Sequence, residues 1–360
     1  MNPATGIEKE QRATLLSTNN GTVVKIGDRI ETNPPGRYIF DNVPANLRDK
    51  PTLSVMLDNK TPRAQDLQLS YLTAGLSWRA DYVAELNQDD NRIDLNGWVT
   101  LNNTSGTSYN NAQMQLVAGD VNIVRDRMHP RMRNKMVAME MTAQADSSMR
   151  EEALFEYHLY TLQRPTTIRD KQKKQVSLLT ASNVPVKKEL VLQGNNYYYR
   201  SASRQIGEKL KFGVYVELEN EKKNGLGLPL PKGIVRVYKR DSNESLQFIG
   251  EDSISHTPNK DKLRLRLGEA FDVVANKKQT AFKINERALG RDTYDSSYVI
   301  EVSNGKKEAV EVIIREPIPG DWKILQESSP HKKVAAHLAQ WRLQVPAEGK
   351  ATLEYSTRVK

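Results

Sequence analysis

The chain has 360 residues, of which 53 are Lys or Arg and 44 are Asp or Glu, so its formal net charge is +9, and it contains no cysteine. This length exceeds the roughly 250–300 residues at which a single hydrophobic core stops growing, so we expect several domains. The absence of cysteine excludes disulfide bonds, thiolate metal sites and a cysteine nucleophile.

Residues 1–60 are expected to form a small β-barrel-like module. Strand patterns at 22–26 and 37–40 are separated by turn residues, and a third pattern at 53–57 closes the module. The first twelve residues are polar and carry no apolar signal-peptide region. Because residues 2–6 read like the inside of a loop, we expect the chain to be a fragment whose export signal lies upstream.

Residues 61–205 are expected to form a β-sandwich that is interrupted by an insertion at 125–152. The insertion is basic and Met-rich and has no β-alternation, so we predict that it is helical or disordered. Around it, period-two alternation predicts strands at 66–72, 78–86, 92–102, 113–117, 155–162, 176–179, 186–192 and 197–200.

The remaining chain is expected to form a β-sandwich module at 206–276 and an immunoglobulin-like sandwich at 277–360. Predicted strands are 211–219, 234–239, 246–249 and 263–267 in the first, and 278–285, 297–303, 310–316, 322–325, 336–345 and 351–359 in the second. Asn304-Gly305 predicts a hairpin turn. The polar stretches at 101–106 and 302–305 both follow an apolar strand, which suggests that the modules are similar. The overall fold class is therefore all-β, with several β-sandwich modules in series.

Four stretches resemble one bacterial family. They are Leu69–Tyr82 (LSYLTAGLSWRADY), Asn96–Gly106 (NGWVTLNNTSG), Gly268–Val273 (GEAFDV) and the ending that begins at Trp341-Arg342-Leu343. In this order they resemble the family named domain of unknown function 4139, which is related to proteins called mucoidy inhibitor A. The resemblance implies an exported, β-rich envelope protein in the periplasm or at the cell surface. It implies no catalytic residues, and the name mucoidy inhibitor suggests an effect on capsule or exopolysaccharide.

Trp78, Arg79, Asp81 and Tyr82 form the candidate ligand site on one predicted strand. Alternation sends Trp78 and Tyr82 to one face and Arg79 and Asp81 to the other. One interpretation is a sugar-stacking aromatic pair or an Arg-Asp site. The other, which we favour, is a core tryptophan with an ion pair on the outer face.

The Met-rich insertion offers a weaker metal hypothesis. Met132, Met136 and Met139 have helical spacing, and their thioethers with His129 could hold Cu(I). The alternatives are an adaptable docking surface for a partner helix or an anionic membrane, and a flexible insertion or local packing helix, which we favour. No two histidines have metal-ligand spacing, so we expect no metal and no cofactor.

No motif of a hydrolase elbow, a Walker loop or a dinucleotide fold occurs in the sequence. We therefore expect a non-enzymatic structural or interaction protein of the bacterial cell envelope, with a protein partner or self-association. The alternative is a polysaccharide-binding or glycan-active protein, because the positive charge allows an anionic polysaccharide as partner. We expect no nucleic-acid partner, since no recognition helix or zinc finger is present, and no transmembrane segment, since no apolar run reaches 18 residues.

Overall fold

The structure is a computed structural model that describes residues 10–18, 21–34, 37–39, 52, 54–60, 63–119, 149–203, 205–285 and 292–360. It is all-β: its described helices are two short 3-10 turns, η1 (Tyr197–Tyr199) and η2 (Lys222–Asn224). No helix in these ranges is long and apolar enough to cross a membrane. The chain divides into two compact units, residues 1–66 and residues 67–360.

The first unit contains a three-stranded antiparallel sheet of β1 (Thr14–Ser17), β2 (Val23–Ile26) and β3 (Arg29–Thr32). The predicted strand at 22–26 is confirmed as β2. The predictions at 37–40 and 53–57 are wrong for the positions that are described, because residues 37–39 and 54–57 belong to no strand. The apolar side chains there, such as Ile39, are exposed, and no strand of the described residues pairs with these segments.

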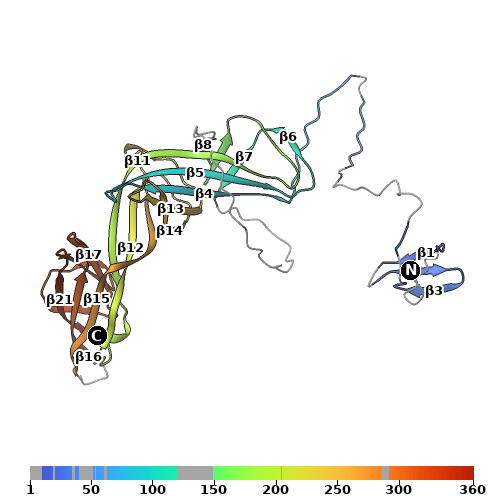
Figure 1. The fold of residues 1–360 in the computed structure, drawn as a ribbon. Coiled ribbons are helices and arrows are strands. Elements are labelled where there is room, and N and C mark those ends of the chain that lie inside the picture. Colours follow the sequence, from blue (N-terminus) through green and yellow to red (C-terminus); the bar gives the residue numbers. More distant parts are fainter. Residues whose placement is uncertain are drawn as a thin grey trace. The chain divides into compact units, whose positions relative to one another are not determined.

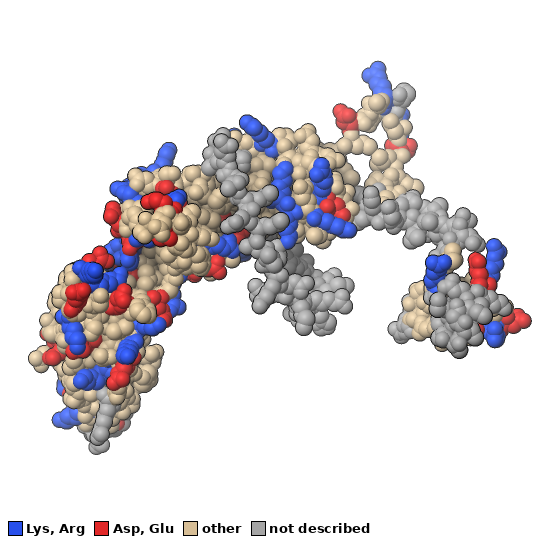
Figure 2. Space-filling view, viewed as in Figure 1, with Lys and Arg blue, Asp and Glu red and all other residues tan. Residues whose placement is uncertain are grey.

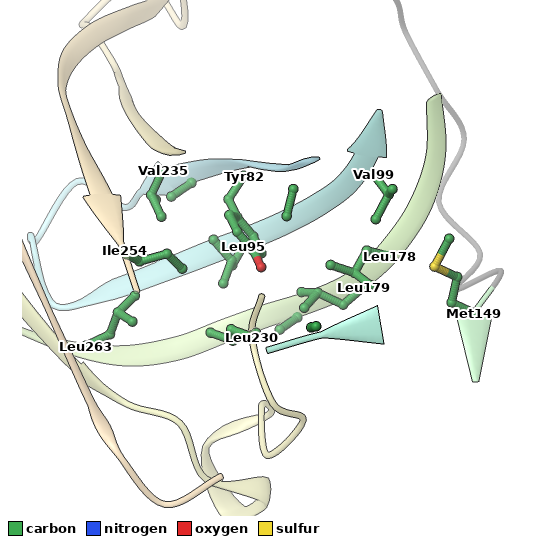
Figure 3. Packing of buried hydrophobic residues seen from close by; sticks show 14 of the residues in the cluster. Tyr82, Leu95, Val99, Met149, Leu178, Leu179, Leu230, Val235, Ile254 and Leu263 are labelled. Atoms are coloured by element: carbon green, nitrogen blue, oxygen red, sulfur yellow. The ribbon is translucent and has the colours of Figure 1, made fainter. Parts of the chain in front are cut away.

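The second unit begins with the hairpin of β4 (Leu76–Leu86) and β5 (Arg92–Asn103). The first half of β11 (Lys173–Gln193) pairs with β5. β13 (Gly233–Arg240) pairs with β4 in parallel, and β14 (Leu246–Ile254) pairs with the other edge of β13. The order β14-β13-β4-β5-β11 forms one layer around a hydrophobic cluster that we call the first core. Figure 3 shows Tyr82 of β4, Leu95 of β5 and Val235 of β13 among its members.

Five short strands add side chains to the first core. They are β6 (Tyr109–Ala112), β7 (Gln115–Ala118), β8 (Met149–Leu154), β9 (Tyr157–Leu162) and β10 (Thr166–Ile168), arranged as the pair β10-β6 and the sheet β7-β9-β8. Most of the predicted insertion at 125–152 lies outside the described residues. Its described end, Met149 to Glu152, is part of β8.

The chain then builds a second cluster, the second core. The strands that contribute to it are β12 (Gln205–Glu219), β15 (Lys262–Asn285), β16 (Thr293–Asn304), β17 (Val310–Pro317), β18 (Trp322–Glu327), β20 (Leu338–Val345) and β21 (Lys350–Val359). The exposed strand β19 (Lys332–Ala335) pairs with β20. Side chains of β17 and β20 meet those of β16 and β21 across it, as where Trp341 packs on Tyr355 with ring centroids 4.7 Å apart.

Three long strands serve both cores. β11 gives Leu178 to the first core and Leu190 to the second, and β12 gives Leu218 and Phe212 in the same way. β15 contributes Leu263 to the first core. Further along the same strand, Ala270, Val273 and Ala275 belong to the second core. Figure 1 shows these strands continuing from one region of the unit into the other. The predicted module boundary at 276/277 lies inside β15, which runs through it without a break.

Three local predictions in this unit are wrong. Residues 66–72 form no strand, and Leu67, Leu69 and Tyr71 are exposed because no ladder partner lies beside them. Residues 197–199 form η1 instead of a strand, because the rings of Tyr198 and Tyr199 both turn into the second core. Asn304-Gly305 is no hairpin turn, since β16 pairs with β15 and β21 and not with β17.

Buried asparagines close the ends of β5 and β16 in the same way. The side-chain amides of Asn103 and Asn304 each donate to the carbonyl oxygen four residues later, at 2.8 Å in both cases. Their Oδ1 atoms accept the backbone N–H two residues later, at 3.0 Å in both cases. The amide nitrogens also donate across to the carbonyl oxygens of Arg169 and Pro346, at 3.0 and 2.9 Å.

The strand registers around these asparagines correspond as well. Leu76 pairs with Asn103 in the first module, and Val273 pairs with Asn304 in the second. On the other side of each asparagine strand, Lys173 pairs with Asn102, and Lys350 pairs with Ser303. In the facing strands, Ile168 pairs with Tyr109, and Val345 pairs with Val310. The strands β4, β5, β6, β10 and β11 therefore repeat the arrangement of β15, β16, β17, β20 and β21. The similarity suggested by the stretches at 101–106 and 302–305 is a structural correspondence.

Candidate functional site

The four residues of the predicted ligand site lie on the two faces of β4. Tyr82 is fully buried in the first core, and its hydroxyl donates to the carbonyl oxygen of Pro231 at 2.8 Å. Trp78 packs at the edge of the same core. On the other face, Arg79 Nε lies 3.0 Å from Asp81 Oδ2, and Arg236 also approaches Asp81 at 3.5 Å. The structure does not bring these residues together around one ligand.

The residues of the copper hypothesis, His129, Met132, Met136 and Met139, lie outside the described residues, so the hypothesis stays a prediction. Within the described ranges no group of three His, Asp or Glu side chains is placed to hold a metal ion. His331 lies between the rings of Trp322 and Trp341 and contacts Glu327 at 2.9 Å, which is a packing role.

A hollow of about 220 Å³ lies where the two cores meet. Aliphatic side chains form much of its wall, and Asp90, Lys188, Lys239 and Glu269 supply its polar groups. Asp90 bridges the two lysines, with Oδ2 2.6 Å from Lys188 Nζ and Oδ1 2.5 Å from Lys239 Nζ. With Glu269 also in the wall, the lining carries two positive and two negative side chains.

The pKa of Asp90 reflects this bridge. Burial alone raises the pKa of the carboxyl, but the hydrogen bonds and charges of Lys188 and Lys239 outweigh burial and hold the pKa below its ordinary value. Asp90 therefore ties the turn after β4 to β11 and β13 as a carboxylate at neutral pH.

The opposite face of β11, β12 and β15 carries what we call the arginine cluster: Arg264, Arg315 and Arg342 around Glu189, with Tyr215. Strand alternation places Glu189 and Tyr215 on this face, because their neighbours Lys188, Val214 and Val216 line the hollow. The buried Glu189 carboxylate receives Arg264 at 3.3 Å and Arg342 at 3.7 Å. The guanidinium of Arg264 lies over the Tyr215 ring, 3.8 Å from its centroid.

Two of the three guanidinium groups keep unused donors. Arg315 Nε donates to Gln340 at 2.9 Å, and among the described residues no carboxylate forms an ion pair with Arg315. The Nε of Arg264 is buried and has no hydrogen-bond partner there. Burial and the charge of Arg264 lower the pKa of Arg315, so the cluster holds like charges at close range. A carboxylate or another oxyanion would satisfy the donors of the half-buried Arg315, because the guanidinium fork matches such groups.

Sequence reasoning missed the arginine cluster because its members come from five strands, with Tyr215 on β12. Glu189 lies on β11, Arg264 on β15, Arg315 on β17 and Arg342 on β20. Strand pairing across more than a hundred residues brings them together, as in the parallel register of β11 and β17. The only signal in the sequence was the position of Arg342 inside the Trp-Arg-Leu stretch.

The surface charge is otherwise mixed. Figure 2 shows Lys and Arg side chains interspersed with Asp and Glu on the visible face. Many of these are paired across neighbouring strands, for example Arg358 with Asp295 at 2.6 Å. The arginine cluster differs from these paired charges by the unused donors of Arg315.

Comparison with known proteins identifies one family. Residues 67–360 match the family model described as Domain of unknown function (DUF4139). No curated protein and no solved structure matches the chain. The matched range coincides with the second compact unit and includes both cores and the arginine cluster. The chain belongs to the DUF4139 family.

Proposed function

We propose that the protein is a non-enzymatic structural or interaction protein of the bacterial cell envelope, in the periplasm or at the cell surface. The observation that carries the proposal is the continuity of β11, β12 and β15 through both cores. A flexible linker would let two modules move independently, whereas shared strands fix them because bending would break ladder hydrogen bonds. A fixed pair of modules suits a scaffold. We further propose that both modules are immunoglobulin-like sandwiches, on the strength of their shared registers.

The partner is a protein of the envelope or a second copy of the chain, and we propose β14 as its contact. β14 is the last strand in its sheet, and Leu246 and Phe248 on it are about half exposed, at 48% and 55%. A sheet edge with exposed apolar side chains is a template for pairing with another strand.

Crosslinking in native cells, followed by fractionation and affinity purification, tests this proposal. We expect the same envelope protein, or the chain itself, to be recovered with the wild type and with the control Phe271→Ser, which alters an exposed phenylalanine on β15. Phe248→Ser is expected to lose it. Recovery of the chain in the cytoplasmic fraction, or equal recovery with both variants, contradicts the proposal.

A second candidate function is binding of an anionic polysaccharide, and the arginine cluster is the observation that favours it. The guanidinium of Arg315 is half-buried and forms no ion pair with a described carboxylate, so its free donors suit a sugar carboxylate. Titration with polygalacturonate is expected to show binding that weakens with salt, and Arg315→Gln is expected to reduce affinity about tenfold, the equivalent of one charged hydrogen bond. Arg164→Gln, which removes an exposed charge outside both candidate sites, serves as the control. Equal affinity of the two variants refutes this candidate.

A further inference from the structure

The second core contains a buried ion pair. Lys277 on β15 and Glu316 on β17 lie with Nζ 2.7 Å from Oε2, and their side chains are 2% and 0% exposed. Removing two charges from water costs several kcal/mol per ion, which their attraction repays only with good geometry and further hydrogen bonds. Such a pair in the middle of an aromatic core requires an explanation.

Four tyrosine rings enclose the pair. Lys277 Nζ lies 3.9 Å from the ring centroid of Tyr198 and 5.9, 5.1 and 5.8 Å from those of Tyr199, Tyr298 and Tyr355. All four tyrosines are buried, so the side chains around the amine and the carboxyl exclude solvent. Gly194 completes the enclosure, because a Cβ at this position would lie 2.5 Å from Glu316 Oε1.

The two carboxyl oxygens of Glu316 have very different surroundings. Oε2 accepts the hydroxyl of Tyr198 at 2.5 Å and that of Tyr199 at 2.8 Å, in addition to the ammonium group of Lys277. Oε1 is buried and has no hydrogen-bond partner among the described residues. An ionised carboxylate normally uses both oxygens as acceptors, so this arrangement is unfavourable for a permanent ion pair.

The first core shows that the shared strand arrangement does not require these residues. The registers place Ala80, opposite Val99, where the second core has Lys277, opposite Ile300. They likewise place Gly97 where the second core has Tyr298. The first core is closed with small and apolar side chains at these positions, so the charged pair serves a purpose other than building the sandwich.

We propose that Lys277 and Glu316 condense into an intramolecular amide, an isopeptide bond that joins β15 to β17. In this step Nζ attacks Cδ of Glu316 and the bond from Cδ to Oε1 breaks. Two protons of the ammonium group end on Oε1, which leaves as water, and the third stays on the amide nitrogen. The pair is converted into a neutral amide, and no oxidant, reductant or other reactant is consumed.

The geometry suits this reaction. Since a carboxyl C–O bond is about 1.2 Å long, Nζ lies within roughly 4 Å of Cδ, near the separation of about 3–3.5 Å for reacting atoms. Tyr198 and Tyr199 donate to Oε2, where negative charge develops when the amine attacks, and so act as an oxyanion hole. Tyr198 also accepts from Lys277 Nζ at 2.7 Å, which holds the amine beside the carboxyl group, so that Nζ itself passes its protons to Oε1 as the new bond forms.

The surroundings also favour the reacting forms and the product. Burial lowers the pKa of Lys277, against the opposing effect of Glu316, and thereby favours the neutral amine that attacks. The product removes both buried charges and the unpartnered Oε1, while Oε2 keeps its two tyrosine donors. β15 and β17 are not ladder neighbours, so the bond would link two layers of the second core.

Intact-mass spectrometry of the denatured full chain tests the proposal. We expect the wild type to be lighter than its sequence by the mass of one water, and a protease digest to contain one branched peptide that includes Lys277 and Glu316. Lys278→Met, which changes the exposed neighbour, is expected to show the same loss, and Lys277→Met is expected to have the full mass of its sequence.

Glu316→Gln provides a second measurement that does not depend on the behaviour of Lys277→Met. The same attack on a glutamine releases ammonia, so this variant is expected to be lighter than its sequence by one ammonia and to give the same branched peptide. A wild-type chain with the full mass of its sequence after incubation at neutral pH overturns the proposal, as does a water loss that Lys277→Met retains.

Discussion

At the scale of single residues, the buried asparagines Asn103 and Asn304 are expected to be the most sensitive polar positions outside the second core's ion pair. Each buried amide donates to several backbone carbonyl oxygens, and one acceptor of each, that of Ile168 or Val345, lies in a buried pair. Removing the side chain leaves buried carbonyl oxygens unpaired, at about 1–3 kcal/mol for each unsatisfied group. Asn103→Ala and Asn304→Ala should therefore each lower the free energy of unfolding by about 2–4 kcal/mol.

Urea unfolding followed by fluorescence measures both variants. Asn102→Ala, at the half-buried neighbouring position, is the control and should stay within about 0.5 kcal/mol of the wild type. Because the two asparagines make corresponding bonds, their effects should agree within a factor of about two, allowing for context. A large effect at one asparagine and none at the other would contradict the correspondence of the two modules.

Tyr82 separates the two interpretations of the predicted ligand site. Its hydroxyl is buried and donates to Pro231, and burial raises its pKa, so the group is neutral at any physiological pH. Tyr82→Phe should destabilise the protein by about 1–2 kcal/mol through the unpaired carbonyl of Pro231, measured by urea unfolding. Polysaccharide binding should stay unchanged in the same variant. A loss of binding without a loss of stability would restore the ligand interpretation.

At the scale of elements, Asp90 holds the turn between β4 and β5 against β11 and β13. Asp90→Asn should lower stability by about 1–2 kcal/mol at pH 7, because it removes two charge-assisted hydrogen bonds at a half-exposed site. Lys188 and Lys239 depress the folded-state pKa below the unfolded value. The contribution is therefore complete above the unfolded pKa of about 3.9 and is lost as the pH falls through the folded-state pKa.

The difference in unfolding free energy between the wild type and Asp90→Asn should thus be constant from pH 7 to about pH 5 and should shrink below about pH 4. Urea unfolding at a series of pH values checks this. Asp89→Asn changes the exposed neighbour in the same turn and should match the wild type at each pH. A difference that persists at pH 2 would show that the effect is not electrostatic.

Alternation predicted the strands that are buried on one face, and it failed where tertiary contacts decided the outcome. The predicted strands at 78–86 and 92–102 are close to β4 and β5, since both strands alternate between core and outer face. The same alternation at 66–72 finds no partner strand. The length of β15 could not be read from the sequence either, because its bend near Gly268 interrupts the pattern without ending the ladder.

The candidate sites were even less predictable than the strands. The pairs that define them, such as Lys277 with Glu316 and Arg264 with Glu189, are separated by tens of residues and are joined only by strand pairing. A lysine in an alternating strand normally indicates a solvated position. Only the burial of Lys277 among tyrosines, which depends on η1 folding into the second core, distinguishes it from Lys278 next to it.

At the scale of the whole molecule, the three shared strands predict that the two cores of residues 67–360 unfold together. β11, β12 and β15 cannot lose their ladders in one core without fraying into the other, so damage to either core lowers the stability of both. Leu101→Ala in the first core should cost about 2–5 kcal/mol. Hydrogen exchange measured at increasing urea concentration gives an unfolding midpoint for each strand. We expect the midpoint of β16 and β21 to fall by the same amount as the midpoint of β4 and β5.

The corresponding change in the second core, Val302→Ala, tests the coupling in the other direction. Val302 occupies the register position of Leu101 and is fully buried. The substitution should therefore lower the hydrogen-exchange protection of β4 and β5 together with that of the second core. Independent modules joined end to end would instead show two transitions, each shifted only by the substitution within it. A single coupled transition is what a scaffold needs, because a load on one module is then resisted by the burial in both.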